Sequence, residues 1–315
     1  MIVGIDVSKQ VFDCAWGTSN KVNNQVFEYT NTGISELLKL TPEDAFYVME
    51  ATGVYHTQLA LGLHDAGRKV CIVNPLVIKR YSQMSLSRVK SDRADAQLIR
   101  AYGIQNELKP WVPSSETIVE LKQAHSWLDD LIRDQTRLLN REEALTHQVN
   151  VSQFVSEQMA EQKKQFKEQI KACEHHLDAT VKKAFPDLYQ RLQTIPSIGN
   201  KTATELIIIT HGFERFSDVK ALSAYAGISP TTYRSGTSVR GRGGIAKMGR
   251  GRIRQLLYLC SWTAKTCNTG CKSLYDRLEA AGKPKKVINI AVAHKLLRQA
   301  FAVAISGKNY SLDCA

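Results

Sequence analysis

Residues 2–9 read IVGIDVSK, an apolar strand that carries one acidic side chain. Because side chains alternate across a strand, Ile2, Gly4 and Asp6 share one face. Burying an ionised carboxylate among apolar residues is unfavourable unless the group is paired or binds a metal ion. This strand therefore predicts both the start of a sheet and a chemically active position within it.

The residues that follow predict a mixed sheet with helices packed on it. β-branched and aromatic residues between turn formers indicate strands at 11–17, 25–31, 45–50 and 69–74, with helices near 33–39 and 56–66. Three leading strands followed by alternating helices and strands favour an α/β domain over residues 1–110.

Residues 111–188 predict a helical, coiled-coil connector. No Pro or Gly occurs between Ser114 and Phe185, and apolar residues recur at spacings of three, four and seven. Two long helices in an antiparallel hairpin fit this pattern, and so does a longer coiled coil. A role in dimerisation stays open, because Gln135 and Glu142 interrupt one apolar seam.

The net charge of +12 over 315 residues is unevenly distributed. Residues 191–315 hold 20 Lys and Arg against 6 Asp and Glu, whereas residues 1–110 are nearly neutral and residues 111–190 are slightly acidic. Lys and Arg neutralise phosphates and release condensed counterions, so a polyanion is the natural partner of this basic region. The charges lie among glycines and turns, which disfavours a basic helix on a membrane surface.

Composition excludes several classes of protein. An apolar content of 43% with 23% charged residues is typical of a globular chain rather than a disordered one. The sequence has no run of eighteen apolar residues and no signal-peptide pattern, so we expect no membrane span. Seven scattered cysteines, with Cys267 and Cys271 as the one close pair, indicate reduced thiols in a cytoplasmic protein.

Three further carboxylates join Asp6 in a candidate metal site. Glu50 ends the apolar strand AFYVME, and Asp92 and Asp95 open a helix three residues apart. Carboxylates from two strands and one helix start can converge at a sheet edge and supply hard oxygen ligands for two Mg²⁺ ions. Asp92 and Asp95 could instead favour the positive end of their helix, with Ser91 as its cap. Asp6 alone could be the phosphate-loop acid of an actin-like or sugar-kinase fold.

Residues 189–315 predict a helical domain with a helix-hairpin-helix-like motif. The segment IPSIGNKTA, residues 195–203, reads as a helix end, a tight turn and a helix start. In such a motif the turn offers backbone N–H groups to a DNA phosphate, and Gly199 and Lys201 would make that contact here. Ser197 stands where a first Gly is usual, and a plain helical connection stays an alternative.

A polar, Gly-rich loop is expected at residues 235–251. From 234 to 254 the chain has six glycines and no acid, and glycines let a backbone approach a phosphate closely. The basic residues that could clamp a phosphate are Arg234, Arg240, Arg242, Lys247, Arg250, Arg252 and Arg254. A serine nucleophile needs such cations, and Ser235 lies at the start of this loop, flanked by Arg234 and Gly236. A nucleic-acid-binding loop with incidental serines stays an alternative.

Six segments together form a recognisable pattern. In chain order, GIDVSK, MEATGVY, KSDRADA, LQTIPSIGNKTA, LSAYAGISP and YRSGTSVRGRGG closely resemble the DEDD transposases of bacterial insertion sequences. That family includes the pilin-gene invertase and the bridge-RNA-guided serine recombinases. The resemblance covers nearly the whole chain.

The resemblance implies a fold, a chemistry and partners. The first domain would be a RuvC-type, ribonuclease H-like domain with the four acids Asp6, Glu50, Asp92 and Asp95. In the C-terminal transposase domain Ser235 would attack a DNA phosphodiester and form a phosphoserine, although Thr237 and Ser238 lie close by. The expected partners are Mg²⁺, for which Mn²⁺ can substitute, donor and target DNA, a structured bridge RNA, and further copies of the chain in a dimer or tetramer with composite active sites.

We therefore expect an RNA-guided DNA transposase that acts in insertion-sequence mobility. One rival is a two-metal nuclease or junction resolvase, in which activated water cuts DNA and Ser235 only contacts phosphate. Another is a non-catalytic nucleic-acid-binding protein. The three differ in their products: a protein–DNA adduct, a free 5′-phosphate end, or uncut DNA.

Overall fold

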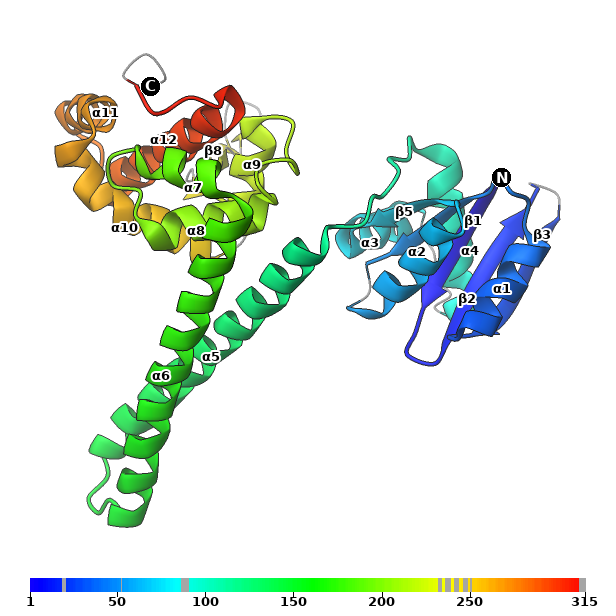
Figure 1. Ribbon diagram of the computed structural model, residues 1–315, viewed down its shortest axis with the longest axis horizontal. Coiled ribbons are helices and arrows are strands. Elements are labelled where there is room, and N and C mark those ends of the chain that lie inside the picture. The colour runs from blue at the N-terminus through cyan, green and yellow to red at the C-terminus, as the bar shows by residue number, and fades with distance from the viewer. Residues whose placement is uncertain are drawn as a thin grey trace. The chain divides into compact units, whose positions relative to one another are not determined.

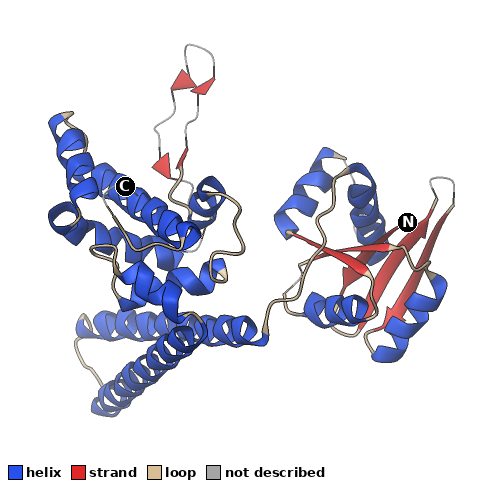
Figure 2. Cartoon of the chain, turned by 45° about the horizontal axis from the view of Figure 1, so that its top comes forward, coloured by secondary structure: helices blue, strands red, loops and turns tan. Residues whose placement is uncertain are grey.

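The computed structural model describes residues 1–18, 21–51, 53–85, 91–231, 234–235, 239–240, 244–245, 249 and 251–311. The chain divides into two compact units, Met1–Ser114 and Ser115–Ala315. The first unit contains a five-stranded sheet, and the described part of the second is helical apart from four short strands (Figure 2). Each unit has a hydrophobic core of its own.

The sheet of the first unit is mixed, as the sequence predicts. The strands β1 (Ile2–Val7), β2 (Val11–Gly17) and β3 (Val22–Glu28) form an antiparallel meander. The strands β4 (Phe46–Glu50) and β5 (Lys69–Val73) continue the sheet on the other side of β1, both parallel to it. The resulting order is β3-β2-β1-β4-β5, so β1 lies at the centre.

Helices cover both faces of this sheet (Figure 1). The helices α1 (Asn31–Leu40) and α2 (Tyr55–Asp65) pack on the face that carries Val3 and Ile5. The helices α3 (Pro75–Met84) and α4 (Asp92–Gln105) pack on the opposite face. This opposite face includes Gly4, and by the alternation of the strand it also includes Asp6.

The helix α3 was not expected from the sequence. Pro75 ends the predicted strand, but it also occupies the first turn of α3, where its missing N–H has no cost. The side chain of Asn74 caps this helix by accepting a hydrogen bond from Leu76 N at 2.9 Å.

The predicted pair of long helices is present. The helices α5 (Glu116–Thr146) and α6 (Gln153–Ala184) pack against each other as an antiparallel hairpin (Figure 1). Lys163 Nζ lies 2.7 Å from Glu142 Oε2 near the tip, and Cys173 Sγ donates to the carbonyl oxygen of Ala124 nearer the base. The hairpin belongs to the second unit, and supercoiling of its helices stays a prediction.

The remaining helices surround the largest core. They are α7 (Pro186–Gln193), α8 (Asn200–Thr210), α9 (Val219–Ala226), α10 (Gly251–Cys267), α11 (Thr269–Ala280) and α12 (Lys285–Ser306). Among described helices, α12 alone is long and apolar enough by composition to cross a membrane. Its side chains Val292, Leu296 and Val303 lie in the core together with α8 and α10 residues, so α12 is the central helix of this unit.

Two small antiparallel sheets lie in the expected loop at residues 235–251 and in the residues just before it. The strand β6 (Pro230–Thr231) pairs with β9 (Gly244–Ile245), and β7 (Arg234–Ser235) pairs with β8 (Val239–Arg240). One pair is nested inside the other along the chain, which makes a two-tiered hairpin. A two-residue strand carries too little periodicity for sequence analysis to detect.

Candidate active site

The structure brings the four predicted carboxylates together in the first unit. Asp6 lies near the end of β1 and Glu50 ends β4. These strands are parallel neighbours, with Ile5 in register with Met49, so Asp6 and Glu50 follow at the same end of the sheet. Asp92 and Asp95 lie in the first turn of α4, and that helix packs across β1.

Close approach of α4 to the sheet depends on glycine. A Cβ atom at Gly4 would lie 2.3 Å from the carbonyl oxygen of Ala96 and 2.3 Å from the backbone nitrogen of Arg100. At the other end of the helix, a Cβ at Gly103 would lie 2.9 Å from Ile2 Cγ2. The backbone of α4 therefore rests directly on β1, and this contact carries its acidic first turn to Asp6.

The local sequence also fixes where α4 begins. The hydroxyl of Ser91 accepts a hydrogen bond from Ala94 N, which caps the helix. The positive end of the helix dipole then lies beside Asp92 and Asp95. The helix cap that the sequence suggested at Ser91 is therefore present, and Asp92 and Asp95 lie near the other acids as well.

Asp6 is partly buried and lies within electrostatic range of the other acids. Burial is the main cause that raises the pKa of Asp6 to about 6, and the charges of Asp95, Asp92 and Glu50 raise it further. Burial and the charge of Asp95 likewise raise the pKa of Glu50. A site of this kind favours a bound cation, because a cation relieves both the repulsion and the cost of burial.

A fifth carboxylate was missed by the sequence analysis. Asp13 on β2 is the direct cross-strand partner of Asp6 on β1. Its pKa is raised by burial and by the charge of Asp92, and it contributes in turn to the raised pKa of Asp6. The antiparallel register that opposes these two acids depends on the turn between β1 and β2, and like charges directly opposite are unfavourable.

The donor chemistry of the cluster suits a hard divalent cation, since all its side chains offer carboxylate oxygen. Within the described ranges, however, no three His, Cys, Asp or Glu side chains lie close enough together to form a metal-binding group. The carboxylates thus lie near the ends of β1 and β4, but they are not close enough together to surround a single metal ion.

The predicted serine lies in the second unit. Ser235 is in β7, where its backbone is in register with Val239, and Arg234 is in register with Arg240. The hairpin β7–β8 therefore sets two of the predicted arginines opposite each other, one residue from Ser235. Thr237, Ser238, Arg242, Lys247 and Arg250 lie outside the described residues.

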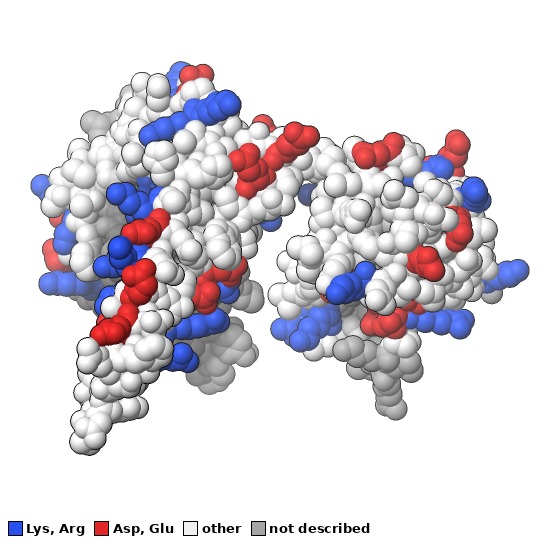
Figure 3. All heavy atoms as spheres, turned by 60° about the horizontal axis from the view of Figure 1, so that its bottom comes forward, with Lys and Arg blue, Asp and Glu red and all other residues white. Residues whose placement is uncertain are grey.

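Two of the predicted phosphate ligands have carboxylate partners within the second unit. Lys201 Nζ lies 2.8 Å from Glu174 Oε2 on α6. Arg252 is engaged by three carboxylates, those of Asp129, Glu174 and Glu205, and Glu205 is only 3% exposed. In Figure 3, Lys and Arg side chains of this unit lie next to Asp and Glu side chains on the face shown. Arg254 donates to the carbonyl oxygen of Ala226 at the end of α9.

These contacts build a network of His125, Asp129, Glu174, Glu205 and Arg252, here called the Arg252 network. His125 Nε2 lies 2.7 Å from Glu205 Oε2, and Arg252 Nε lies 3.1 Å from the same oxygen. Its members come from α5, α6, α8 and α10. Because Arg252 is the second residue of α10, the network anchors the point where the two-tiered hairpin enters that helix.

The helix-hairpin-helix-like turn has one unusual residue. Ser197 has a φ of 81°, in the left-handed region that favours glycine, which accounts for the Gly expected at this position. Gly199, by contrast, has a φ of −92° and would accommodate a Cβ, with nothing within 4 Å. It precedes α8, whose first turn has no side-chain cap, so backbone N–H groups remain there for an outside acceptor.

Known proteins share this sequence organisation. A family model described as a transposase of the DEDD, IS110 type matches residues 3–151, and one described as "Transposase IS116/IS110/IS902 family" matches residues 189–276. The pilin gene-inverting proteins of Moraxella lacunata and Moraxella bovis are each 30% identical to the chain over 96% of its length and 94% of theirs.

Two more distant similarities are also found. An uncharacterised 43.6 kDa protein of insertion element IS110 from Streptomyces coelicolor is 26% identical over 72% of this chain and 56% of its own length. The structure of Thermus thermophilus RuvC aligns with 35% of the chain and 99% of its own, at 15% identity and a TM-score of 0.26. With two family models in chain order and near full-length relatives, the chain belongs to the IS116/IS110/IS902 family of transposases.

Proposed function

We propose that this transposase cuts and rejoins DNA by attack of Ser235 on a phosphodiester, assisted by Mg²⁺ at Asp6, Glu50, Asp92 and Asp95. The observation that carries the proposal is the acidic cluster of the first unit, where burial and the charges of four neighbouring carboxylates raise the pKa of Asp6. Such repulsion in a partly buried place disfavours the apo protein, and a bound cation reverses it. Mn²⁺, which also prefers carboxylate oxygen, would substitute.

The acids have one role and the serine another. When bound, the divalent ion would act as a Lewis acid on the phosphate oxygens and stabilise the charge of the transition state. The four acids would hold that ion, and the strand order β3-β2-β1-β4-β5, which makes β1 and β4 neighbours, supports this role for Asp6 and Glu50.

Cleavage by the serine keeps the DNA phosphate in an ester bond to the protein, which can be used for rejoining. The Ser235 hydroxyl loses its proton as its oxygen bonds to phosphorus, the bond from phosphorus to a deoxyribose oxygen breaks, and that oxygen takes up a proton. Rejoining reverses the step, with a strand hydroxyl displacing the serine. Arginines of the hairpin, Arg234 and Arg240 among them, would stabilise the charge on the phosphate.

Recognition of the DNA sites would come from outside the chain. We propose that a bridge RNA pairs with donor and target DNA, and that the acids of one subunit act with the serine of another in a dimer or tetramer. The basic C-terminal region and the turn at Gly199 supply phosphate contacts that do not depend on base sequence.

An SDS gel tests the chemistry. The full chain is incubated with Mg²⁺, labelled donor and target DNA and the RNA transcribed beside its gene. We expect a labelled, SDS-resistant protein band that is lost in Ser235→Ala and in Asp6→Ala. Thr237→Ala and Ser238→Ala are the matched controls and should retain the band.

Other results would select a different function. Cleaved DNA with free 5′-phosphate ends and no adduct would identify a two-metal nuclease that uses activated water. An adduct that persists in Ser235→Ala but is lost in Ser238→Ala would move the nucleophile along the loop. Binding without any cleavage in wild-type protein would leave a nucleic-acid-binding protein.

A further inference from the structure

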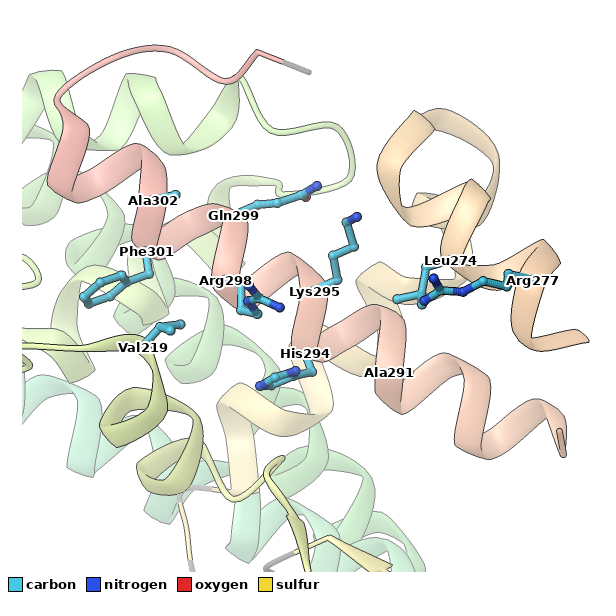
Figure 4. Close-up of a pocket in the computed structure, with 10 residues that line it drawn as sticks. All are labelled: Val219, Leu274, Arg277, Ala291, His294, Lys295, Arg298, Gln299, Phe301 and Ala302. Atoms are coloured by element: carbon cyan, nitrogen blue, oxygen red, sulfur yellow. The ribbon is translucent and has the colours of Figure 1, made fainter. Parts of the chain in front are cut away.

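A cationic hollow lies in the second unit, and its lining contains neither the acids of the first unit nor any residue of β6–β9. It has a volume of about 710 Å³ and is lined by α11 and α12, with Val219 at the start of α9 (Figure 4). Its lining includes three permanent cations, Arg277 on α11 and Lys295 and Arg298 on α12, and no carboxylate. We call it the α11–α12 hollow.

The three cations are arranged by helix periodicity. Lys295 and Arg298 are three residues apart, so they lie on one face of α12, and Arg277 approaches the same space from α11 (Figure 4). The opposite face of α12 carries Leu296 and Val303, which are fully buried in the core. Because the apolar face of α12 is buried in the core, its charged face lines the hollow.

Within the part of the chain that the structure describes, the charges of this hollow have no carboxylate counterion. Among the residues that the structure describes, no carboxylate forms an ion pair with Arg277, Lys295 or Arg298. Lys201 and Arg252 differ in this respect, because carboxylates of α5, α6 and α8 neutralise them. Unpaired cations around a concave surface create a positive potential that attracts a polyanion.

The neutral residues of the lining complete the surface. His294 Nε2 lies 3.0 Å from the hydroxyl of Ser223, and burial together with the charge of Arg298 lowers the pKa of this histidine. Leu274, Phe301 and Val219 are apolar residues of the same lining. The hollow therefore combines cationic and apolar side chains, which suits a sugar–phosphate chain better than an isolated inorganic anion.

We propose that the α11–α12 hollow binds the sugar–phosphate backbone of a nucleic acid, at a site separate from the hairpin that carries Ser235. The inference rests on the proposed function, because it assumes that the transposase acts on a nucleic-acid complex. It adds a second anchoring point on the unit, contributed by helices whose sequence shows no nucleic-acid motif. A lipid surface fits less well, since the apolar side of α12 is buried.

The test compares two double variants that remove equal charge. Arg277→Gln with Arg298→Gln removes one exposed cation from each wall of the hollow. Lys285→Gln with Lys286→Gln removes two exposed cations from the start of the same α12 outside its lining. Unchanged melting temperatures will show that both variants fold.

Binding of the full-length protein to a labelled 30-bp DNA duplex and to a labelled RNA hairpin is measured by fluorescence anisotropy from 50 to 300 mM KCl. We expect the hollow variant to bind at least about 10-fold more weakly at 150 mM KCl, with a salt slope smaller by about two. The Lys285/Lys286 control should lose on the order of twofold or less. If the affinity for one nucleic acid falls more than for the other, the hollow binds that nucleic acid. Equal losses of affinity for DNA and RNA mean that the hollow contacts only the backbone that the two share.

Several outcomes would overturn the inference. Equal weakening by both double variants would show a general charge effect, and unchanged binding by the hollow variant would show that the hollow is not used. Loss of binding to phosphatidylserine vesicles, with nucleic-acid binding intact, would assign the surface to lipid. The adduct gel is run in parallel. If wild type forms the adduct but the hollow variant binds nucleic acid as well as wild type does, only this inference is refuted. If the hollow variant binds more weakly but wild type forms no adduct, only the serine chemistry is refuted.

Discussion

Asp6 is a residue whose ionisation opposes folding. The pKa of its carboxyl rises from 3.8 to about 6 on folding, so the folded state binds its proton more tightly than the unfolded state does. The associated stability is present below pH 3.8 and is lost as the pH rises through about 6. At pH 8, without metal, the ionised group therefore destabilises the first unit.

Asp6→Asn should accordingly stabilise the metal-free protein at pH 8. A shift of this size corresponds to about 3 kcal/mol, which we reduce to about 1–2 kcal/mol because the side chain is partly exposed to solvent. Urea unfolding at pH 8 and pH 4 measures the difference, which should shrink at pH 4. Adding Mg²⁺ should stabilise wild type more than the variant. A variant less stable than wild type at pH 8 in EDTA would mean that Asp6 is satisfied by the protein itself.

Ser197 is strained in a way that a single substitution relieves. Its φ of 81° is unfavourable for any residue with a Cβ, and its Oγ is buried without a hydrogen-bond partner in the part of the chain that the structure describes. Ser197→Gly should stabilise the second unit by about 0.5–1 kcal/mol after the extra entropy of glycine in the unfolded chain is subtracted. Thermal unfolding checks this against Ser197→Ala, which keeps the strain. Equal effects of the two substitutions would place the cost in the hydroxyl rather than in the backbone.

Among the elements, α4 depends most on one contact. Adding a methyl group at Gly4 places it 2.3 Å from backbone atoms of Ala96 and Arg100, which cannot move without displacing the helix. Gly4→Ala should therefore destabilise the first unit by about 3 kcal/mol or more and separate Asp92 and Asp95 from Asp6. Gly199→Ala is the matched control, since that position has open space. Chemical denaturation and Mg²⁺-dependent stabilisation both report the change, and a Gly4→Ala protein as stable as the control would contradict the packing argument.

The Arg252 network joins four helices, so its loss should lower the stability of the second unit. Arg252→Gln leaves the buried carboxylate of Glu205 with His125 as its remaining close partner, and removing one member of a buried pair costs about 3–5 kcal/mol. Arg254→Gln removes the same charge two residues away but only one long hydrogen bond to a backbone carbonyl. Melting temperatures should therefore fall far more for Arg252→Gln. Similar melting temperatures, with DNA binding lost only in Arg252→Gln, would return Arg252 to the phosphate-binding role that the sequence predicted.

At the scale of the whole molecule, local patterns predicted the elements better than the partners of their charged residues. The strands around Asp6 and Glu50 and the long helices α5 and α6 follow from alternation, spacing and the lack of Pro and Gly. The pairing of Arg252 with Asp129 joins positions more than 120 residues apart, and nothing in either local sequence signals it. Asp13 was missed for the same reason, because its role comes from strand register.

The two units should also unfold separately. Each has a core of its own: one set of buried residues belongs to the sheet and its helices, and another to α5 through α12. Differential scanning calorimetry of the full chain should therefore show two transitions. Mg²⁺ and Asp6→Asn should move only the transition of the first unit, and Arg252→Gln only that of the second. A single transition that shifts with both substitutions would show that the two cores are energetically coupled, so that a change at Asp6 would also affect the stability of the second unit.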